Sequence, residues 1–470
     1  MKIVLINPPL ENIISSNVPA ILEKGEDYLP PLGLMYVAAY LKKFTAHQII
    51  ILDCLVEKID YPNLEKKIQE INPDIVGVTT LTFALIDVVK TLKIVKKINP
   101  GIRTVLGGPH VNIYPQETIN LPEVDFIVLG EGEFTCKNLI DNIDNPENLK
   151  AVLGLVFKDK EKKIFNTGRQ PLIKELDDLP FPARELTPYQ KYSSVLSENK
   201  PVTTMFTSRG CPYNCLFCDR PHLGKVFRAR SAKNVVDEMA ECKKMGIKEI
   251  FIYDDTFTID RQRVVDICAE IIKRNLNIFW DVRARVNTVD EELLKKMKAA
   301  GCKRIHYGVE AGNQKILDIL RKGITLEMAK NAFAATKKAG LTTLAYFMIG
   351  SPTETEKEIK QTIKFAKKIK ADFAHFAILT PFPATDVYAL GLKEKVLPFD
   401  YWQKFASNPV VDFRPYFWEK EIKREELIRL LKKAYFSFYF RPKFILKQII
   451  KLNNFQEFKK KARIALGLIK

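Results

Sequence analysis

The sequence predicts an α/β protein in which a doubly wound parallel domain precedes a partial (β/α)6 barrel and a helical carboxyl-terminal region. Three observations lead to this prediction. Five buried-strand runs alternate with helical patterns over the first 145 residues, and six further strand–helix units begin at Val202. The last seventy residues lose the strand pattern. We therefore expect domains at 1–148, 201–395 and 396–470, with a strand pair and linker at 149–200.

The first five strands are expected at residues 2–6, 48–52, 74–79, 103–106 and 125–129, with helices between them, for example at 34–44 and 84–97. Continuous apolar strands separated by helices indicate a parallel sheet covered on both faces. Such domains bind their ligand beyond the carboxyl ends of the strands. The loops there are rich in Gly and Pro, which allows close approach of the backbone to a large ligand. They read Asn7-Pro8-Pro9, Thr79-Thr80, Gly107-Gly108-Pro109-His110 and Gly130-Glu131-Gly132-Glu133.

A strand pair around residues 158–163 and a stiff Leu-Pro-Phe-Pro connector at 179–182 separate this region from the barrel. The barrel strands are expected at 202–208, 249–254, 278–286, 304–309, 342–349 and 372–379. Barrel chemistry takes place at the carboxyl ends of the strands. Polar or backbone-exposing groups follow nearly every strand here, which packing alone does not explain. They are the cysteine cluster, Asp254-Asp255, Arg285, Glu310, Gly350-Ser351-Pro352 and Pro381-Phe382-Pro383.

The basic excess of the chain is concentrated at its end. The net charge is +18, and residues 421–470 contain 14 Lys+Arg against 4 Asp+Glu. A helical period spans 423–440 and resumes at 444–452. One interpretation is a helical cap on the barrel with solvated lysines. The other is an interfacial segment, around 441–470, that brings the protein to an anionic membrane and a lipid-like ligand, which would be its substrate if it is an enzyme.

No apolar run reaches the roughly 18 residues of a membrane-spanning helix. The first ten residues read as a strand without a signal-peptide cleavage site, so we expect a cytoplasmic protein. Eight cysteines in 470 residues do not form a disulfide-dense scaffold.

Three of these cysteines, Cys211, Cys215 and Cys218, have the spacing CxxxCxxC on a loop after the first barrel strand. Three thiolates on a short loop can hold three corners of a four-iron cluster and leave the fourth iron open for a cofactor. An electron from such a cluster can break a carbon–sulfur bond of a chelated sulfonium. Zinc is the alternative, with His222 as a fourth ligand, although no second cysteine pair is present.

The cysteine loop resembles the signature of the radical S-adenosylmethionine (SAM) superfamily, including the aromatic Phe217 before the third cysteine. The resemblance implies that Glu310 holds the ribose or amino group of SAM and that Arg285 is a second anchor. It places Asp254-Asp255 where the superfamily usually has Gly-Gly-Glu, and Gly350 in the turn beside the adenine. Rim salt bridges are the structural alternatives for Glu310 and Arg285.

The amino-terminal loops resemble those of the Rossmann-like cobalamin-binding domain in cobalamin-dependent radical SAM proteins (class B-like methyltransferases). The matching segments are Asn7-Pro8-Pro9, Pro30-Pro31-Leu32-Gly33-Leu34, Gly107-Gly108-Pro109-His110 and Gly130-Glu131-Gly132-Glu133. The usual Asp-x-His-x-x-Gly is missing after the first strand, so we expect no histidine on the cobalt. His110 is interpreted as contacting the nucleotide tail or capping its loop. The alternative is a flavodoxin-like domain that binds nothing.

The resemblance implies three cofactors: a 4Fe-4S cluster, SAM and cobalamin. In the family, one SAM methylates cobalamin, a second supplies a 5′-deoxyadenosyl radical, and an unactivated carbon (or phosphorus) receives the methyl group. An oxidative cyclase, an RNA-modifying enzyme and a cobalamin-binding redox sensor are the alternatives. We expect a small-molecule or lipid-like substrate and an external low-potential donor of the ferredoxin or flavodoxin type. The tail resembles no small RNA-binding barrel, so nucleic acid is not expected as a partner.

Overall fold

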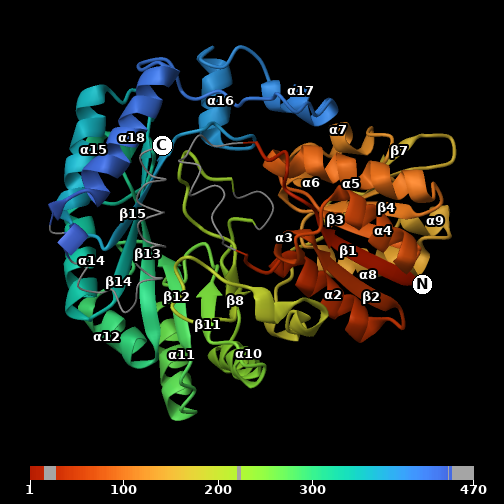
Figure 1. Cartoon of the computed structure of the whole chain (residues 1–470), viewed down its shortest axis with the longest axis horizontal. Helices are drawn as coiled ribbons and strands as arrows, with labels where there is room; N and C mark the ends of the chain where they lie inside the picture. Colours follow the sequence, from red (N-terminus) through yellow and green to blue (C-terminus); the bar gives the residue numbers. More distant parts are fainter. Residues whose placement is uncertain (15–27, 220–223, 443, 447–470) are drawn as a thin grey trace.

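The computed structural model describes residues 1–14, 28–219, 224–442 and 444–446. An amino-terminal sheet covered by helices lies beside a half-open barrel, and helices of the carboxyl-terminal region lie over both (Figure 1). The predicted fold class is therefore confirmed. No described helix is long and apolar enough to cross a membrane.

The amino-terminal sheet has seven strands in the order β2-β1-β3-β4-β5-β6-β7. The first five are parallel, and they are β1 (Lys2–Asn7), β2 (Gln48–Asp53), β3 (Ile75–Thr79), β4 (Arg103–Gly107) and β5 (Phe126–Val128). The predicted strand pair forms β6 (Leu155–Lys158) and β7 (Ile164–Asn166), which add to this sheet in antiparallel fashion. The amino-terminal sheet thus continues to Asn166.

Side chains of the parallel strands alternate between two cores. Ile3 and Leu5 pack with α2 (Leu32–Phe44) and α8 (Gly132–Asn142), whereas Val4 and Ile6 face the opposite layer. That layer contains α4 (Tyr61–Ile71), α5 (Leu85–Ile98), α6 (Pro109–Ile113) and α7 (Pro115–Ile119). Two short helices complete the domain, α3 (Cys54–Glu57) and α9 (Pro146–Leu149). The strand order reverses between β1 and β3, which is where open α/β sheets bind ligands.

The barrel sheet contains six parallel strands that follow one another in chain order. They are β8 (Val202–Met205), β11 (Glu249–Ile252), β12 (Phe279–Ala284), β13 (Cys302–Glu310), β14 (Thr342–Ile349) and β15 (Phe373–Ile378). The first and last strands are not neighbours, so the barrel stays open. A short ribbon of β9 (Ser208–Arg209) and β10 (Arg228–Ala229) follows β8.

Local sequence explains why the outer helices begin where they do. Ser231, Asp260, Asp290 and Thr325 each accept a hydrogen bond from a backbone N–H in the first turn of the helix that follows. The outer helices are α10 (Ala232–Lys244), α11 (Arg261–Lys273), α12 (Glu291–Ala299), α13 (Gln314–Ile319), α14 (Leu326–Lys338) and α15 (Glu356–Lys368).

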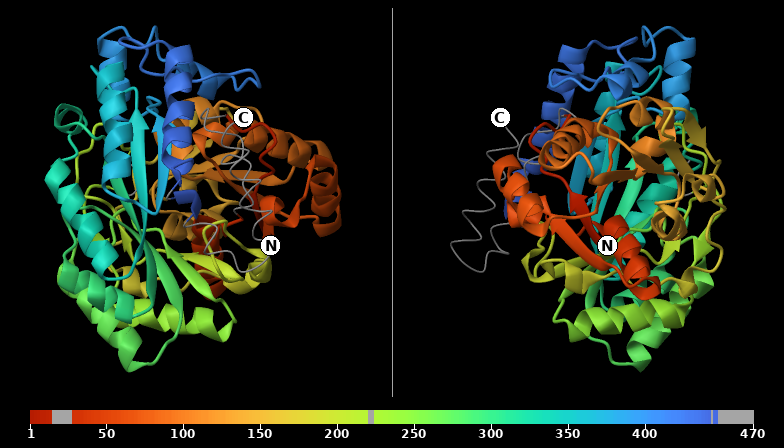
Figure 2. Two further views of the ribbon diagram at one scale, coloured as in Figure 1. Left: turned by 60° about the vertical axis from the view of Figure 1, so that its left-hand side comes forward. Right: turned by 90° about the vertical axis from the view of Figure 1, so that its right-hand side faces the viewer.

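The carboxyl-terminal region contains α16 (Asp386–Lys393), α17 (Tyr401–Ser407) and α18 (Arg424–Tyr439). Helix α18 lies alongside α15 and covers β15 (Figures 1 and 2). The Tyr435 hydroxyl donates to the Phe376 carbonyl at 2.8 Å and accepts from its N–H at 3.1 Å, which satisfies the open edge of β15. The predicted helix over 423–440 is therefore a cap on the barrel, whereas most of 441–470 lies outside the described residues.

Helix α17 connects the barrel to the amino-terminal domain. Trp402 and Phe405 belong to the same apolar core as α5 and α7. The Gln403 amide donates to Glu117 at 2.7 Å. This packing fixes the position of α17 against the helices of the amino-terminal domain.

Candidate active site

The three predicted cluster cysteines lie on one loop that the β9–β10 ribbon closes at its base. The Leu216 N–H donates to the Leu320 carbonyl, and the Leu216 carbonyl accepts from the Val387 N–H, so the loop is attached to the barrel rim. Cys215 is buried, and Cys211 and Cys218 are half-buried; none forms a disulfide. Burial raises the pKa of the Cys211 thiol.

In the described part of the chain, no three Cys, His, Asp or Glu side chains are grouped closely enough to hold a metal ion. The structure places the three thiols on one loop. Their softness and number suit an iron–sulfur cluster with one open iron. His222, the ligand in the zinc alternative, lies outside the described residues.

Arg285 and Glu310 both contact Lys322 beside this loop. The Arg285 guanidinium donates to the Cys215 sulfur at 3.4 Å and stacks 3.8 Å from the centre of the Tyr213 ring. Arg285 also donates to the carbonyl of Lys322, whose ammonium lies 5.7 Å from the Phe217 ring centre.

Glu310 ends β13 in a left-handed conformation, with φ at 71°, beside an irregularity in strand register. Such a bulge re-aims a side chain at the end of a strand. Its carboxylate forms a buried ion pair with the Lys322 ammonium at 2.7 Å. A Cβ atom on Gly308 would lie 2.4 Å from the same carboxylate, so the carboxylate occupies space that only glycine leaves open. Lys322 was not among the residues predicted from the sequence.

The two predicted aspartates have different environments. Asp254 is fully buried, and its carboxylate accepts hydrogen bonds from the backbone and side chains of Thr207 and Ser208. This carboxylate is therefore occupied in shaping the chain that leads to Cys211. Asp255 is an exposed residue. Partial desolvation of its carboxyl group, together with repulsion from Asp254, raises its pKa.

Gly350 has a φ of 78°, which glycine adopts without strain, and it follows β14 as expected. The next residue, Ser351, donates its N–H to Glu354 at 3.0 Å. Glu354 is 1% exposed, and burial raises its pKa to about 7. Glu354 was not among the predicted residues, because a glutamate near a helix start reads as an ordinary first-turn residue.

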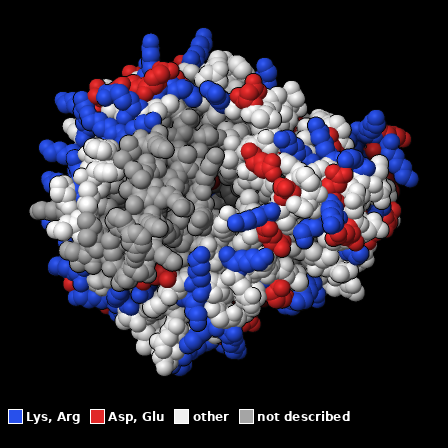
Figure 3. Space-filling view, viewed as in Figure 1, with Lys and Arg blue, Asp and Glu red and all other residues white. Residues whose placement is uncertain are grey.

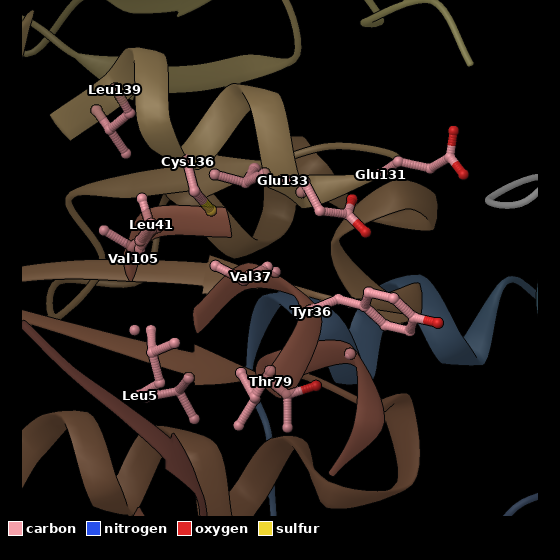
Figure 4. Close-up of a pocket in the computed structure, with 18 of the residues that line it drawn as sticks. Leu5, Tyr36, Val37, Leu41, Thr79, Val105, Glu131, Glu133, Cys136 and Leu139 are labelled. Carbon is pink, nitrogen blue, oxygen red and sulfur yellow. The ribbon is translucent and has the colours of Figure 1, made fainter. Parts of the chain in front are cut away.

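A cavity opens between the amino-terminal sheet and helices α2 and α8 (Figure 4). It encloses about 1040 Å³ of empty space, part of it open to solvent. Most of its walls are apolar, whereas Tyr36, Glu131 and Glu133 bring polar groups to one end. Eight of the predicted cobalamin residues line it: Gly33, Thr79, Gly107, Gly108, Gly130, Glu131, Gly132 and Glu133.

Other lining residues escaped the sequence analysis, among them Leu5, Tyr36, Gly77, Phe206 and Arg209. Gly77 carried a signal, because a glycine inside a strand often marks a close approach of a ligand. Arg209 gave no such signal, since its place at the cavity depends on how the two domains pack.

Six predicted residues do not line the cavity: Asn7, Pro8, Leu32, Thr80, Pro109 and His110. Asn7 instead donates to Asp53 at 2.8 Å. His110 is fully buried, its Nδ1 lies 3.1 Å from the Thr82 hydroxyl, and burial lowers its pKa to about 3. Within the described residues its Nε2 has no hydrogen-bond partner. These contacts support the interpretation of His110 as a neutral cap on its loop.

The cavity suits the nucleotide tail of cobalamin. It is a mainly apolar slot at the switch point between β1 and β3, with glycine backbone on its walls. At Gly108, φ is 104° and a Cβ atom would lie 2.9 Å from the Thr80 carbonyl oxygen, so this rim position accepts only glycine.

Comparisons with known proteins match both domains. The Radical SAM superfamily model matches residues 205–366, and the B12 binding domain model matches residues 18–140. An uncharacterized methyltransferase of Pyrococcus horikoshii, PH0819, is 38% identical over 459 residues, which span 97% of this chain and 96% of that protein. The chain belongs to the cobalamin-binding radical SAM family. The predicted resemblance is confirmed.

Two further proteins are similar to this chain. The anaerobic magnesium-protoporphyrin IX monomethyl ester cyclase of Rubrivivax gelatinosus is 34% identical over 389 residues, 81% of this chain and 70% of that protein. The structure of the cobalamin-dependent SAM radical enzyme OxsB aligns with a TM-score of 0.74 at 18% identity, covering 99% of this chain and 71% of that one. This chain is thus a radical SAM enzyme, and its cofactors are a 4Fe-4S cluster, SAM and cobalamin.

Proposed function

We propose that the protein is a methyltransferase that transfers a methyl group to an unactivated carbon (or phosphorus) of a small molecule. One observation carries the proposal: Arg209 lines the cavity of the amino-terminal domain and stands two residues before Cys211. The two cofactor sites are therefore adjacent. When bound, the cluster and SAM supply radical chemistry and cobalamin supplies a methyl carrier. The full-length similarity to an uncharacterized methyltransferase supports the same activity.

The residues of this chain bind and orient the cofactors. Cys211, Cys215 and Cys218 are proposed to hold three irons, and Arg285 donates a hydrogen bond to the Cys215 sulfur. Glu310 is placed to accept the amino group of SAM, a cation like the Lys322 ammonium that contacts it now.

We place the substrate against the inner wall of the barrel. The Tyr307 hydroxyl contacts Thr336 of α14, and strand side chains alternate, so His306 points into the barrel. His306 Nε2 lies 3.2 Å from Asp281, and Nδ1 lies 3.1 Å from the Tyr346 hydroxyl. This chain of hydrogen bonds orients a half-buried tyrosine on the inner wall of the barrel, the wall against which we place the substrate.

The reaction needs a reductant, for which we propose a ferredoxin or flavodoxin in the cytoplasm. Lys and Arg lie on both domains with Asp and Glu among them on the face in Figure 3. A charge distribution of this kind does not favour nucleic acid as the partner. Membrane contact through 441–470 stays a proposal that rests on the basic tail.

The test is anaerobic reconstitution followed by addition of SAM and reductant. The wild type should release 5′-deoxyadenosine, and Cys215→Ala should abolish it, because a cluster lacking a ligand cannot present SAM. Cys268→Ala is the matched control, since Cys268 is a buried core cysteine of α11 away from the loop. Continued 5′-deoxyadenosine formation by Cys215→Ala would overturn the assignment of the cluster.

Oxidative cyclisation is the second candidate, favoured by the 34% identity to a cyclase over 81% of the chain. Product mass separates the two. Methyl transfer adds one methyl group to the product and releases S-adenosylhomocysteine, whereas cyclisation removes hydrogens. A redox sensor without catalysis would leave SAM intact under strong reductant.

A further inference from the structure

Four charged side chains form a buried cluster between the two cofactor sites. Arg209 donates to Glu131 at 2.8 Å and to Glu133 at 2.6 Å, and Arg228 donates to Glu131 at 2.8 Å. The exposed fractions of these four residues range from 3% to 8%. We call this group the Arg–Glu cluster.

The Arg–Glu cluster joins the parts of the chain that surround the two sites. Arg209 and Arg228 lie opposite each other in the strand register of the β9–β10 ribbon, which closes the base of the cysteine loop. Glu131 and Glu133 lie at the start of α8, and both line the amino-terminal cavity. The two arginines therefore belong to the segment that carries the cysteine loop, and the two glutamates belong to the segment that lines the cavity.

Further hydrogen bonds lock the cluster in one arrangement. Glu131 accepts the N–H of Ile173 at 2.7 Å, and Arg228 donates to the Ile173 carbonyl at 2.6 Å, which ties in the linker between the domains. Burial alone would raise the pKa of Glu131, but Arg209 and Arg228 outweigh burial and hold the pKa below its usual value. The two glutamates and two arginines balance in charge.

General stability does not require such a group. Burying an ion pair costs the hydration energy of both charges, and the attraction between them recovers only part of this energy. Apolar side chains of similar volume often stabilise a protein equally well. Ion pairs do, however, fix the direction and separation of the two side chains, because a guanidinium donates hydrogen bonds to a carboxylate only in fixed positions. A cluster between two cofactor sites is therefore best explained by the geometry that it imposes.

We propose that the Arg–Glu cluster positions the cysteine loop over the cobalamin cavity, so that cleavage of SAM stays coupled to methyl transfer. The inference rests on the proposed methyltransferase activity. Arg209, Arg228, Glu131 and Glu133 are positioning residues, because they act on the cofactors through the loops that carry them.

The test compares Glu133→Gln with Glu133→Asp and with the control Glu249→Gln. Glu133→Gln removes the charge but keeps the shape, and Glu133→Asp keeps the charge. Glu249 is 2% exposed and pairs with Arg304 at the opposite end of the barrel, so Glu249→Gln reports on the loss of any buried carboxylate. The readouts are iron and cobalamin content, the electron paramagnetic resonance spectrum of the reduced cluster with SAM, and 5′-deoxyadenosine formed per methylated product.

We expect Glu133→Gln to retain iron and cobalamin but to raise 5′-deoxyadenosine per product about tenfold, because small misplacements between reacting groups cost large factors in rate. The spectrum of the SAM-bound cluster should change, and Glu133→Asp should recover most of the coupling. Wild-type coupling in Glu133→Gln would overturn the proposal, as would an equal loss in Glu249→Gln. Loss of cobalamin with an unchanged cluster spectrum would also overturn it, since Glu133 would then be a simple cobalamin contact. Failure of the wild type to cleave SAM would instead overturn the proposed function.

Discussion

Replacing Asp254 with alanine should loosen the cysteine loop, although Asp254 touches none of the three cysteines. Its carboxylate accepts the N–H groups of Thr207 at 2.6 Å and of Ser208 at 3.0 Å, as well as both hydroxyls. The hydroxyls can turn to other partners, whereas the two backbone N–H groups stay buried without an acceptor. At about 1–3 kcal/mol for each such group, the substitution should cost about 2–6 kcal/mol.

The neighbouring Asp255 provides the matched control, because its side chain is open to solvent. Thermal unfolding and iron content after anaerobic reconstitution should both fall in Asp254→Ala. Asp255→Ala should stay near the wild type in both. Equal losses in the two variants, or full iron content in Asp254→Ala, would refute the inference that Asp254 shapes the approach to Cys211.

Two other predictions concern residues near the two sites. Gly108→Ala should weaken cobalamin binding at least about tenfold, equal to about 1.4 kcal/mol, because its Cβ atom would lie 2.9 Å from the Thr80 oxygen. Gly130→Ala, with a φ of 71° but nothing within 4 Å, should leave the apo protein less destabilised than Gly108→Ala; equal melting temperatures would contradict this reasoning. The raised pKa of Glu354, about 7 against 4.5, means that the folded state binds the extra proton, so stability is full below about 4.5 and falls as pH rises through 7. Glu354→Gln should flatten this decline, measured as the melting temperature from pH 5 to pH 8, and an unchanged slope would exclude Glu354 as its source.

Local patterns were sufficient to predict most of the fold. Apolar runs marked the strands of both sheets because a strand buried on both faces is apolar throughout its length. The hydrogen bonds by which Ser231 and Asp290 cap the helices that follow them are equally local. The cysteine spacing and the strand-end glycines led to the family and its cofactors, since these groups are close in sequence and need no distant partner to be recognised.

Contacts between distant segments decided the roles of individual side chains. Asp254 and Asp255 are adjacent in sequence, yet one is fully hydrogen-bonded and the other is open to solvent. His110 lies in a matching loop, but its side chain is buried beside Thr82 and does not line the cavity.

The order of strands and helices, the cysteine loop and the glycine-rich rim were all determined by the sequence itself, because each depends on residues only a few positions apart. The partner of each buried charge was decided only by the tertiary structure. Arg209 and Glu131 are 78 positions apart, and no local pattern indicates that their side chains form an ion pair. A charged residue reads as solvent-exposed in a sequence, and only the packing of two domains can bury it against its counter-ion.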